Sequence, residues 1–397
     1  MVGLSIRFEM PRKSTLIITI ATLLTLTIIL GIGVYTIFQQ QTQNDQQQNQ
    51  NDQQSIAVWS YTFHHDMART GYSTSTGPLT NQTMWTHLTQ MQIEYSSPAV
   101  VDGVAYFGSN DHRVRAVNAS TGNIIWSYLT GNSVESSCTV SDGIVYFGSH
   151  DHNVYALDAA KGNKVWNFTT KDEVYSTPAV VEGVVYVGST DKNLYAIDAL
   201  TGREIWSYKT SNSIYSSPAV VNGVIYVNSF DTAYALNAAN GKEIWSFFAW
   251  GPTYSSSAIV NSKVYFGASN TVYALDAASG KKIWNYLTGA RVESSPAVAN
   301  NVLYIGSNDY NVYALDAATG NKIWNYTTGN EVNGSPTVAN DMVYIGSKDS
   351  NVYALNASTG SKLWSYTTGN QIESTPSIAN GILYIGSNDA KVYAFGS

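Results

Sequence analysis

The sequence has little cysteine and little charge. Cys138 is the only cysteine among 397 residues, which excludes an intrachain disulfide and argues against a metal cluster held by thiolates. Charged residues make up only 12% of the chain, and the net charge is −7. Because binding of nucleic acid phosphates needs clustered Lys and Arg, we expect no nucleic-acid partner. Hydrophobic residues reach 44% and tyrosines number 28, which suits a large core with half-buried β surfaces.

Charge is absent altogether from residues 16–38, an apolar run long enough to span a bilayer as a helix. Arg7, Arg12 and Lys13 precede the run, so residues 1–15 are predicted to form a cytoplasmic tail and the rest of the chain to be extracellular or periplasmic. The competing interpretation is a cleaved signal peptide, which the length of the run and the missing Ala-x-Ala site disfavour. No cysteine directly follows the run, which argues against a lipoprotein anchor.

Apolar residues are in turn scarce in residues 39–54, QQQTQNDQQQNQNDQQ. Such a segment cannot form a core, so a flexible Gln/Asn-rich stalk is predicted here. The folded part is expected to begin near Ser55 and to occupy residues 55–397.

The rest of the chain repeats one pattern. After a first interval of 41 residues, tryptophans recur every 39 or 40 residues. A period near 40 is typical of solenoids, arrays and propellers, and a large ring at a fixed place in each repeat is expected to fill the gap to the neighbouring repeat. The repeating tryptophans are Trp85, Trp126, Trp166, Trp206, Trp245, Trp284, Trp324 and Trp364.

Each repeat contains four short runs rich in Val, Ile, Tyr or Trp and bounded by turn residues, which predicts four antiparallel strands. In one copy these runs are Pro178–Val181, Val184–Val187, Leu194–Ile197 and Glu204–Tyr208. Most copies carry a pair such as Asp102-Gly103 between the first two runs, as a tight turn with positive φ requires. Four strands per repeat form one blade of a β-propeller, so the predicted fold class is all-β.

The two ends of the repeat region indicate eight blades. The part from Pro-Ala-Val to Tyr-Ala-Leu occurs eight times, and the last copy stops at Ser397, before its tryptophan strand. Trp85 instead precedes the first copy. Residues 83–88 are therefore predicted to supply the outer strand of the final blade, which closes the ring and removes exposed sheet edges.

The repeats spell A-x-D-x-x-T-G-x-x-x-W, complete from Ala196 to Trp206 and from Ala314 to Trp324. This pattern resembles the tryptophan-docking repeat of the PQQ-like, or quinoprotein alcohol dehydrogenase-like, propellers. The lead-in from Val58 to Ser75 is similar to the segment before the repeats in membrane-anchored surface proteins of this group. The resemblance implies the scaffold and leaves the activity open.

A PQQ-dependent quinoprotein dehydrogenase is the enzyme that the resemblance allows. The family's dehydrogenases add a vicinal Cys-Cys disulfide and long insertions with acid and Asn ligands, whereas this chain has one cysteine and blades of nearly constant length. His112, His150 and His152 lie beside Asp111 and Asp151, but loop residues next to a turn Asp are usually solvated. We therefore predict no catalytic residue, no cofactor and no metal site.

The repeat varies at one position just before each inner strand, and these positions are expected to surround one mouth of the central channel. Their side chains divide into an aromatic half and an acidic half, and Trp250 lies in a nearby FFAWGPTY loop. The predicted ligand face consists of Tyr95, Glu135, Tyr175, Tyr215, Trp250, Tyr254, Glu293, Asn333 and Glu373. Tyr and Trp suit recognition because they give contact area at low entropy cost. The alternative is that these residues only cap a polar rim.

Together these features favour a non-catalytic scaffold at the cell surface, held in the membrane by its N-terminal helix. The expected partner is an unknown protein or glycan. The quinoprotein dehydrogenase and a structural or adhesion protein of the cell envelope remain as alternatives.

Overall fold

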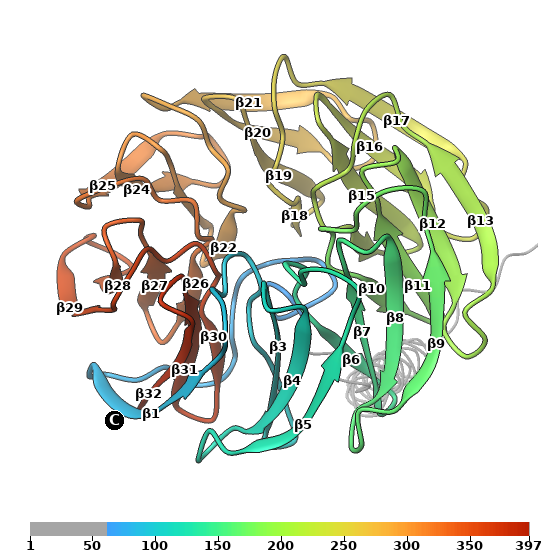
Figure 1. The fold of residues 1–397 in the computed structure, drawn as a ribbon. Helices are drawn as coiled ribbons and strands as arrows, with labels where there is room; N and C mark the ends of the chain where they lie inside the picture. The colour runs from blue at the N-terminus through green and yellow to red at the C-terminus, as the bar shows by residue number, and fades with distance from the viewer. Residues whose placement is uncertain (1–61, 397) are drawn as a thin grey trace, which may run out of the picture. The chain divides into compact units, whose positions relative to one another are not determined.

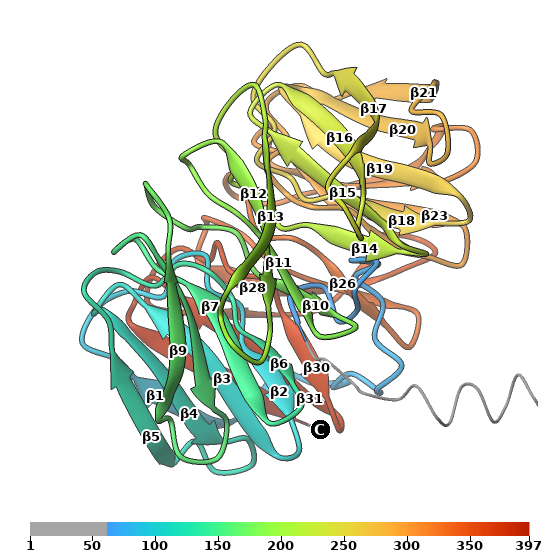
Figure 2. The ribbon, with the colours of Figure 1, turned by 90° about the vertical axis from the view of Figure 1, so that its right-hand side faces the viewer.

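The alternation of short strands and tight turns builds a ring of eight sheets. The computed structural model describes residues 62–396. In this range each of the eight sheets contains four antiparallel strands. Figure 1 looks along the axis of the ring, and Figure 2 shows it from the side. We number the blades along the chain and describe each from its inner strand outward.

Blades 1 to 4 contain β2 (Ala99–Val101), β3 (Val104–Ser109), β4 (Arg113–Asn118), β5 (Ile124–Leu129); β6 (Thr139–Ser141), β7 (Ile144–Gly148), β8 (Asn153–Asp158), β9 (Lys164–Thr169); β10 (Ala179–Val181), β11 (Val184–Gly188), β12 (Asn193–Asp198), β13 (Glu204–Lys209); β14 (Ala219–Val221), β15 (Val224–Ser229), β16 (Thr232–Asn237), β17 (Glu243–Phe248).

Blades 5 to 8 contain β18 (Ala258–Val260), β19 (Lys263–Ala268), β20 (Thr271–Asp276), β21 (Lys282–Leu287); β22 (Ala297–Ala299), β23 (Val302–Gly306), β24 (Asn311–Asp316), β25 (Lys322–Thr327); β26 (Thr337–Ala339), β27 (Met342–Gly346), β28 (Asn351–Asn356), β29 (Lys362–Thr367); β30 (Ser377–Ala379), β31 (Ile382–Ser387), β32 (Lys391–Gly396), β1 (Gln82–Leu88).

The last blade combines the two ends of the described chain. β1 pairs antiparallel with β32, with Gln82 opposite Gly396 and Leu88 opposite Lys391. This is the pairing predicted for residues 83–88. It gives the eighth sheet the order β1-β32-β31-β30, and Figure 1 shows the blue β1 beside the red β32. The predicted all-β, eight-bladed propeller is confirmed.

The turns between the first two strands adopt the predicted conformation. Both residues of each turn have positive φ, for example 48° and 78° at Asp102 and Gly103, and 50° and 58° at Asn261 and Ser262. Two successive residues with positive φ are the mark of a type I′ turn, whose twist matches that of the flanking strands. A pair rich in Asn, Asp and Gly therefore places the first hairpin of every blade.

The core lies between neighbouring sheets. The middle strands are buried on both faces, as in β7, because a blade lies on each side of them. The outer strands alternate: in β9 only Trp166 of six residues is buried. A residue that repeats every 40 positions thus meets the same surroundings in each blade, and apolar side chains fill the wedge between two sheets.

The repeating tryptophans join each blade to the next. Trp166 Nε1 donates a hydrogen bond to the carbonyl oxygen of Ala199 at 2.9 Å, and its ring lies against the turn at Gly202. Gly202 has a φ of 71°, and a Cβ added there would lie 2.7 Å from the ring. Seven tryptophans make the corresponding bond at 2.8–3.1 Å. The motif therefore encodes a contact between blades.

Trp364 is the exception, because blade 8 takes its outer strand from the start of the domain. In the described range Trp364 Nε1 has no hydrogen-bond partner, and its ring contacts those of Tyr344 and Phe395. The Tyr344 hydroxyl donates to the carbonyl oxygen of Pro78 at 2.9 Å, where equivalent tyrosines donate to an alanine of the motif turn. The segment before β1 thus occupies part of the place of the missing turn.

The predicted cytoplasmic tail (1–15), transmembrane helix (16–38) and stalk (39–54), like the start of the predicted domain at 55–61, lie outside the described residues. Among residues 62–396, no helix has the length and hydropathy needed to cross a membrane.

Candidate functional site

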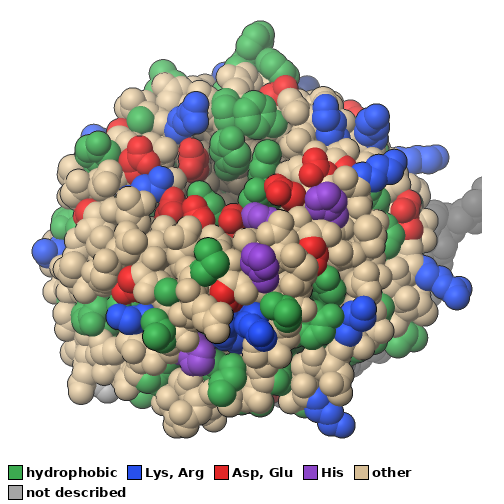
Figure 3. All heavy atoms as spheres, viewed as in Figure 1, with side chains coloured by type: hydrophobic (Ala, Val, Ile, Leu, Met, Phe, Trp, Pro, Cys, Tyr) green, Lys and Arg blue, Asp and Glu red, His purple; other side chains and the backbone are tan. Residues whose placement is uncertain are grey.

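A cavity of about 520 Å³ opens at one end of the ring axis. Figure 3 shows this face hollowed near its centre, with acidic side chains gathered around the hollow. Eight of the nine residues predicted to form the ligand face line this cavity: Tyr95, Glu135, Tyr175, Tyr215, Tyr254, Glu293, Asn333 and Glu373. They come together because each stands in the loop that leads from an outer strand to the next inner strand.

Trp250 does not belong to this lining. Its side chain is 80% exposed, and its ring packs edge-on against Phe248 at 4.9 Å between centroids. Its backbone has a φ of 55° and Gly251 follows it, so the loop turns before it reaches Tyr254. Proximity in sequence suggested Trp250, but the other eight positions are equivalent by the repeat and Trp250 is not.

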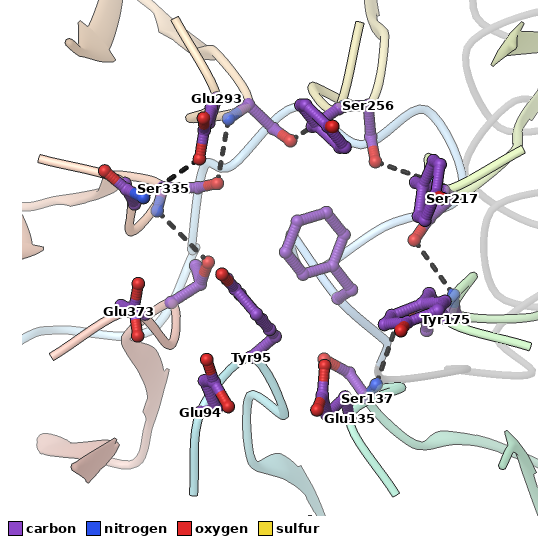
Figure 4. A pocket seen from close by; sticks show the side chains of 17 residues that line it. Glu94, Tyr95, Glu135, Ser137, Tyr175, Ser217, Ser256, Glu293, Ser335 and Glu373 are labelled. Carbon is purple, nitrogen blue, oxygen red and sulfur yellow. Dashed lines mark hydrogen bonds between the residues drawn. The ribbon is translucent and has the colours of Figure 1, made fainter. Parts of the chain in front are cut away.

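A ring of hydroxyl groups encircles the axis at this cavity. The backbone N–H of each blade donates to a Ser or Thr hydroxyl of the next blade, at distances of 2.8–3.3 Å. The last bond, from Thr375 N to Ser97 Oγ at 2.9 Å, closes the circle between blade 8 and blade 1. Figure 4 shows several of these bonds around the cavity. The hydroxyls of this ring belong to Ser97, Ser137, Thr177, Ser217, Ser256, Ser295, Ser335 and Thr375.

The lead-in segment crosses the channel beneath the cavity. Phe63 lines the cavity, and Arg69 is fully buried. The Arg69 guanidinium donates to the carbonyl oxygens of Phe63, Thr177, Pro178 and Pro218, at distances from 2.6 to 3.3 Å. It also donates to the Thr62 hydroxyl. Burial lowers the pKa of Arg69 to about 9, which still leaves it charged at neutral pH.

The backbone of the same lead-in segment also forms hydrogen bonds with the inner strands of further blades. Val220 N donates to Met67 O at 2.8 Å, and Ile259 N donates to Ala68 O at 2.9 Å. Val298 and Val338 make the equivalent bonds to the next part of the lead-in. The inner strands of blades 4 to 7 thus use N–H groups that would otherwise face the channel, and the cavity ends above this segment.

One wall of the cavity is aromatic. The rings of Tyr175 and Tyr215 lie 5.3 Å apart between centroids, and those of Tyr215 and Tyr254 lie at the same distance. His150 continues the series at 4.2 Å from Tyr175. Burial raises the pKa of Tyr175 and of Tyr215, so both present neutral rings.

The other wall is acidic. Glu373 accepts from Lys348 Nζ at 3.1 Å and from Asn388 Nδ2 at 2.9 Å. Glu293 accepts from Asn333 Nδ2 at 2.9 Å. Figure 4 shows Glu94, Glu135 and Glu373 around Tyr95, the one tyrosine on this side. Burial, followed by the charges of Glu373 and Glu94, raises the pKa of Tyr95 well above its usual value.

Glu135 is the least compensated of these carboxyl groups. Its nearest basic group is His150 Nε2 at 3.7 Å, and burial lowers the pKa of that histidine, so it carries no charge at neutral pH. Burial, with the charges of Glu94, Glu173 and Glu373, raises the pKa of Glu135 to about 8. Burial and the neighbouring carboxylates therefore oppose the ionisation of Glu135.

The lining also contains residues that sequence reasoning missed, namely Phe63, Glu94 and the hydroxyl ring. All eight ring residues are Ser or Thr two positions after a mouth residue, and seven of them line the cavity, so the repeat did carry a signal for the ring. Glu94 directly precedes the mouth position of blade 1. Phe63 and Arg69 had no such signal, because the lead-in occurs once.

The aspartates of the second hairpin in most blades hold the fold together. Asp309, which stands in the hairpin between β23 and β24 as Asp151 does between β7 and β8, accepts from Asn311 N in its own turn, from Gly289 N at 2.6 Å and from the Tyr313 hydroxyl at 2.7 Å. It therefore also joins two blades. Among residues 62–396, no three His, Cys, Asp or Glu side chains are arranged to hold a metal ion.

The comparisons with known proteins agree on the scaffold. A family model described as outer membrane protein assembly factor BamB matches residues 74–176, 150–295 and 268–396. Among curated proteins, no relative matches the chain.

Solved structures of the same fold belong to proteins with different functions. BamB from Moraxella catarrhalis is 17% identical, with a TM-score of 0.68 over 80% of this chain and 99% of that one. Quinohemoprotein alcohol dehydrogenase from Comamonas testosteroni is 17% identical, with a TM-score of 0.75 over 85% of this chain and 81% of that one. The computationally designed protein Ika8 is 16% identical, with a TM-score of 0.71 over 80% of this chain and 100% of its own.

These neighbours include enzymes and an assembly factor, so the fold alone is compatible with either role. The family model spans nearly all of the described residues in three overlapping matches. The chain therefore belongs to the family of PQQ-like repeat β-propellers that this model represents.

Proposed function

We propose that the protein is a non-catalytic recognition scaffold that binds a partner protein at the mouth of its channel. The main support is that eight equivalent positions, one per blade, carry different side chains and meet at one cavity. Scaffold positions such as the docking tryptophans stay the same from blade to blade. Differences confined to the rim of a cavity are what selective binding requires. The assembly role in the description of the matching family model supports a protein as the partner.

We further propose that residues 16–38 anchor the protein in a membrane, with residues 1–15 in the cytoplasm and the propeller outside it. The support is the uncharged run and its basic flank. Topology can be tested in intact cells with a membrane-impermeant maleimide. Ser279→Cys in the propeller should react, and Ser14→Cys only after lysis. Cys138 is buried and should stay silent in the parent.

Pyrroloquinoline quinone, the cofactor of the family's dehydrogenases, does not fit this cavity. The quinone carries carboxylate groups and needs cationic or N–H donors to balance them. The cavity is instead lined by Glu94, Glu135, Glu293 and Glu373, and none of its lining residues is Lys or Arg. The Arg69 guanidinium below it is occupied by carbonyl and hydroxyl oxygens. The donor set thus favours a scaffold over the dehydrogenase.

The binding proposal can be tested by photo-cross-linking in intact cells. A benzophenone amino acid replaces Tyr215 at the cavity or, as a control, Ile283 on β21, which is 44% exposed at the outer edge of blade 5. We expect one discrete adduct from position 215, lost when Glu135→Gln and Tyr175→Ala are added. Adducts from position 283 alone would place recognition on the outer edge and refute the proposal. An adduct between two copies of the chain would instead favour the adhesion role.

A further inference from the structure

The cavity offers hydrogen-bond acceptors without a cation to match them. Its lining includes four glutamates and Asn333 but no Lys or Arg. Lys348, the nearby base, is divided between Glu331 and Glu373 at 3.1 Å each. Among residues 62–396, no Lys or Arg forms an ion pair with Glu94, Glu135 or Glu293, although the charges of Lys348 and Arg291 favour the ionised form of Glu293.

Asn333 supplies an independent sign of a missing donor. Its side chain is 7% exposed and lines the cavity. Its Nδ2 donates to Glu293, which fixes the orientation of the amide, and its Oδ1 has no partner among the described residues. A buried carbonyl oxygen without a donor costs free energy, and native proteins rarely leave one so. A ligand with N–H groups would satisfy it.

Glu135 lies on the same rim with only a neutral histidine beside it. Burial, together with the negative charges of Glu94, Glu173 and Glu373, raises the pKa of Glu135 to about 8. A cation in the cavity would remove this penalty. A neutral ligand such as a glycan would leave it in place, so the charge distribution favours the cation.

The facing wall suits the same ligand. Tyr175, Tyr215 and Tyr254 form a continuous series of rings along the cavity. The face of a tyrosine ring attracts an ammonium or guanidinium group, and the ring also packs against an aliphatic stem. Aromatic faces opposite carboxylates and an unpaired amide oxygen form a complementary site for a charged head on an apolar stem.

We propose that the cavity takes up an arginine or lysine side chain presented by a basic loop of the partner protein. The charged head lies on the acidic side of the cavity, which runs from Glu293 and Asn333 around to Glu135, and the stem lies against the tyrosines. This inference rests on the proposed binding role of the cavity and specifies its ligand. A cavity of about 520 Å³ has room for such a side chain with part of its loop.

The test uses the full-length protein in detergent micelles and three octapeptides with identical Gly/Ser flanks. Their two central residues are arginine, citrulline or glutamate; citrulline keeps the shape of arginine and removes its charge. Isothermal titration should show the arginine peptide binding at least about tenfold more tightly than the citrulline peptide. The affinity should fall as salt rises, because exposed ion pairs are screened.

Matched variants locate the binding. Glu135→Gln and Tyr215→Ala should each weaken the arginine peptide about tenfold, through the lost charge and the lost cation–π contact. Glu204→Gln on the exposed β13 and Trp250→Ala outside the cavity should change nothing. Circular dichroism at the working temperature checks that each variant remains folded.

The outcomes separate the two proposals. Equal binding of the arginine and citrulline peptides, or binding of a neutral oligosaccharide panel that Tyr215→Ala weakens and Glu135→Gln does not, overturns the cationic ligand and keeps the cavity as a binding site. Arginine binding that neither cavity variant alters overturns the site itself. No binding by any probe, together with no adduct at position 215 in cells, overturns both.

Discussion

At the residue scale, a glycine and a tryptophan 36 positions before it in the sequence form one contact between blades. Gly202 must tolerate positive φ and also leave room for the ring of Trp166. Gly183, in the first hairpin of the same blade, has a φ of 75° and no atom within 4 Å of an added Cβ. Comparing alanine substitutions at these two positions therefore distinguishes the cost of backbone strain from the cost of the steric clash with the ring.

Gly202→Ala should destabilise the propeller more than Gly183→Ala. Both variants carry the strain of an alanine at positive φ, about 1 kcal/mol. Only Gly202→Ala forces Trp166 away, for about 1–3 kcal/mol more. Urea unfolding followed by tryptophan fluorescence measures both. Equal losses in the two variants would mean that the ring accommodates the methyl group freely.

A second residue-scale prediction concerns pH. The folded-state pKa of Glu135 is about 8, above the ordinary value of 4.5, so folding retains its proton between these values. The contribution of Glu135 to the free energy of unfolding is therefore fully present below pH 4.5 and falls as pH rises toward 8, by up to about 1.4 kcal/mol per pH unit. The groups around this carboxyl are Glu94, Glu173, Glu373 and His150.

Glu135→Gln cannot ionise, so its melting temperature should rise relative to the parent between pH 5 and pH 8. Glu204→Gln serves as the exposed control and should follow the parent across this range. A constant offset between Glu135→Gln and the parent would show that this carboxyl is not opposed in the folded protein.

At the element scale, the lead-in acts as a plug that closes the channel beneath the cavity, and the side chain of Arg69 holds it in place. Arg69 satisfies four carbonyl oxygens, and without it Thr177 O and Pro178 O would lose a donor inside the ring. We expect Arg69→Met to lower the free energy of unfolding by about 3–5 kcal/mol, the usual range for breaking a buried charged network. Arg203→Met on an exposed turn is the control.

Limited proteolysis gives an independent measure of this element. Loss of Arg69 should expose the lead-in to cleavage near residues 62–73 before the blades are cut. Cleavage that begins in the blades at the same time would contradict a separate role for the plug.

The strands, their turns and the closing strand could be predicted because each rests on local patterns that recur. Alternating apolar residues, pairs such as Asp102-Gly103 and the spacing of the tryptophans fix a blade without reference to distant residues. The plug could not be predicted in this way. The partners of Arg69 on the blades lie more than a hundred residues away, and the lead-in has no second copy with which to compare it.

The cavity, too, could be predicted only where its residues belong to the repeat. Tyr175, Glu293 and the equivalent positions were accessible by aligning repeats, whereas Trp250 was proposed from nearness in sequence and lies outside the lining. The unpaired Oδ1 of Asn333 depends on how one amide turns toward Glu293, and only coordinates reveal such an orientation.

At the scale of the whole molecule, aspartates tie successive blades together around the ring. Burial opposes the ionisation of Asp309, but hydrogen bonds from the Tyr313 hydroxyl and the Gly289 N–H outweigh it and lower its pKa; Asp191 has a lowered pKa for the same reasons. A carboxyl with a lowered pKa in the folded state adds stability above its unfolded pKa, and this is lost as pH falls through the folded value.

Asp309→Asn should therefore destabilise the ring at pH 7 by about 1–2 kcal/mol, with the difference from the parent shrinking below pH 4. Urea midpoints at pH 7 and pH 3 measure it, with Asp102→Asn in an exposed turn as the control. A difference that does not change with pH would attribute the loss to geometry and not to charge.

The circle of hydroxyls has a consequence for the electric field inside the ring. Every donor in it points the same way around the axis, from one blade to the next and from blade 8 back to blade 1. Dipoles placed head to tail on a closed loop have tangential components that cancel, so this belt adds almost no net potential at the centre. Whatever approaches the opening is therefore attracted or repelled by the charged side chains around it, and reversing the sign of a few of them would reverse the preference of the same ring between cations and anions.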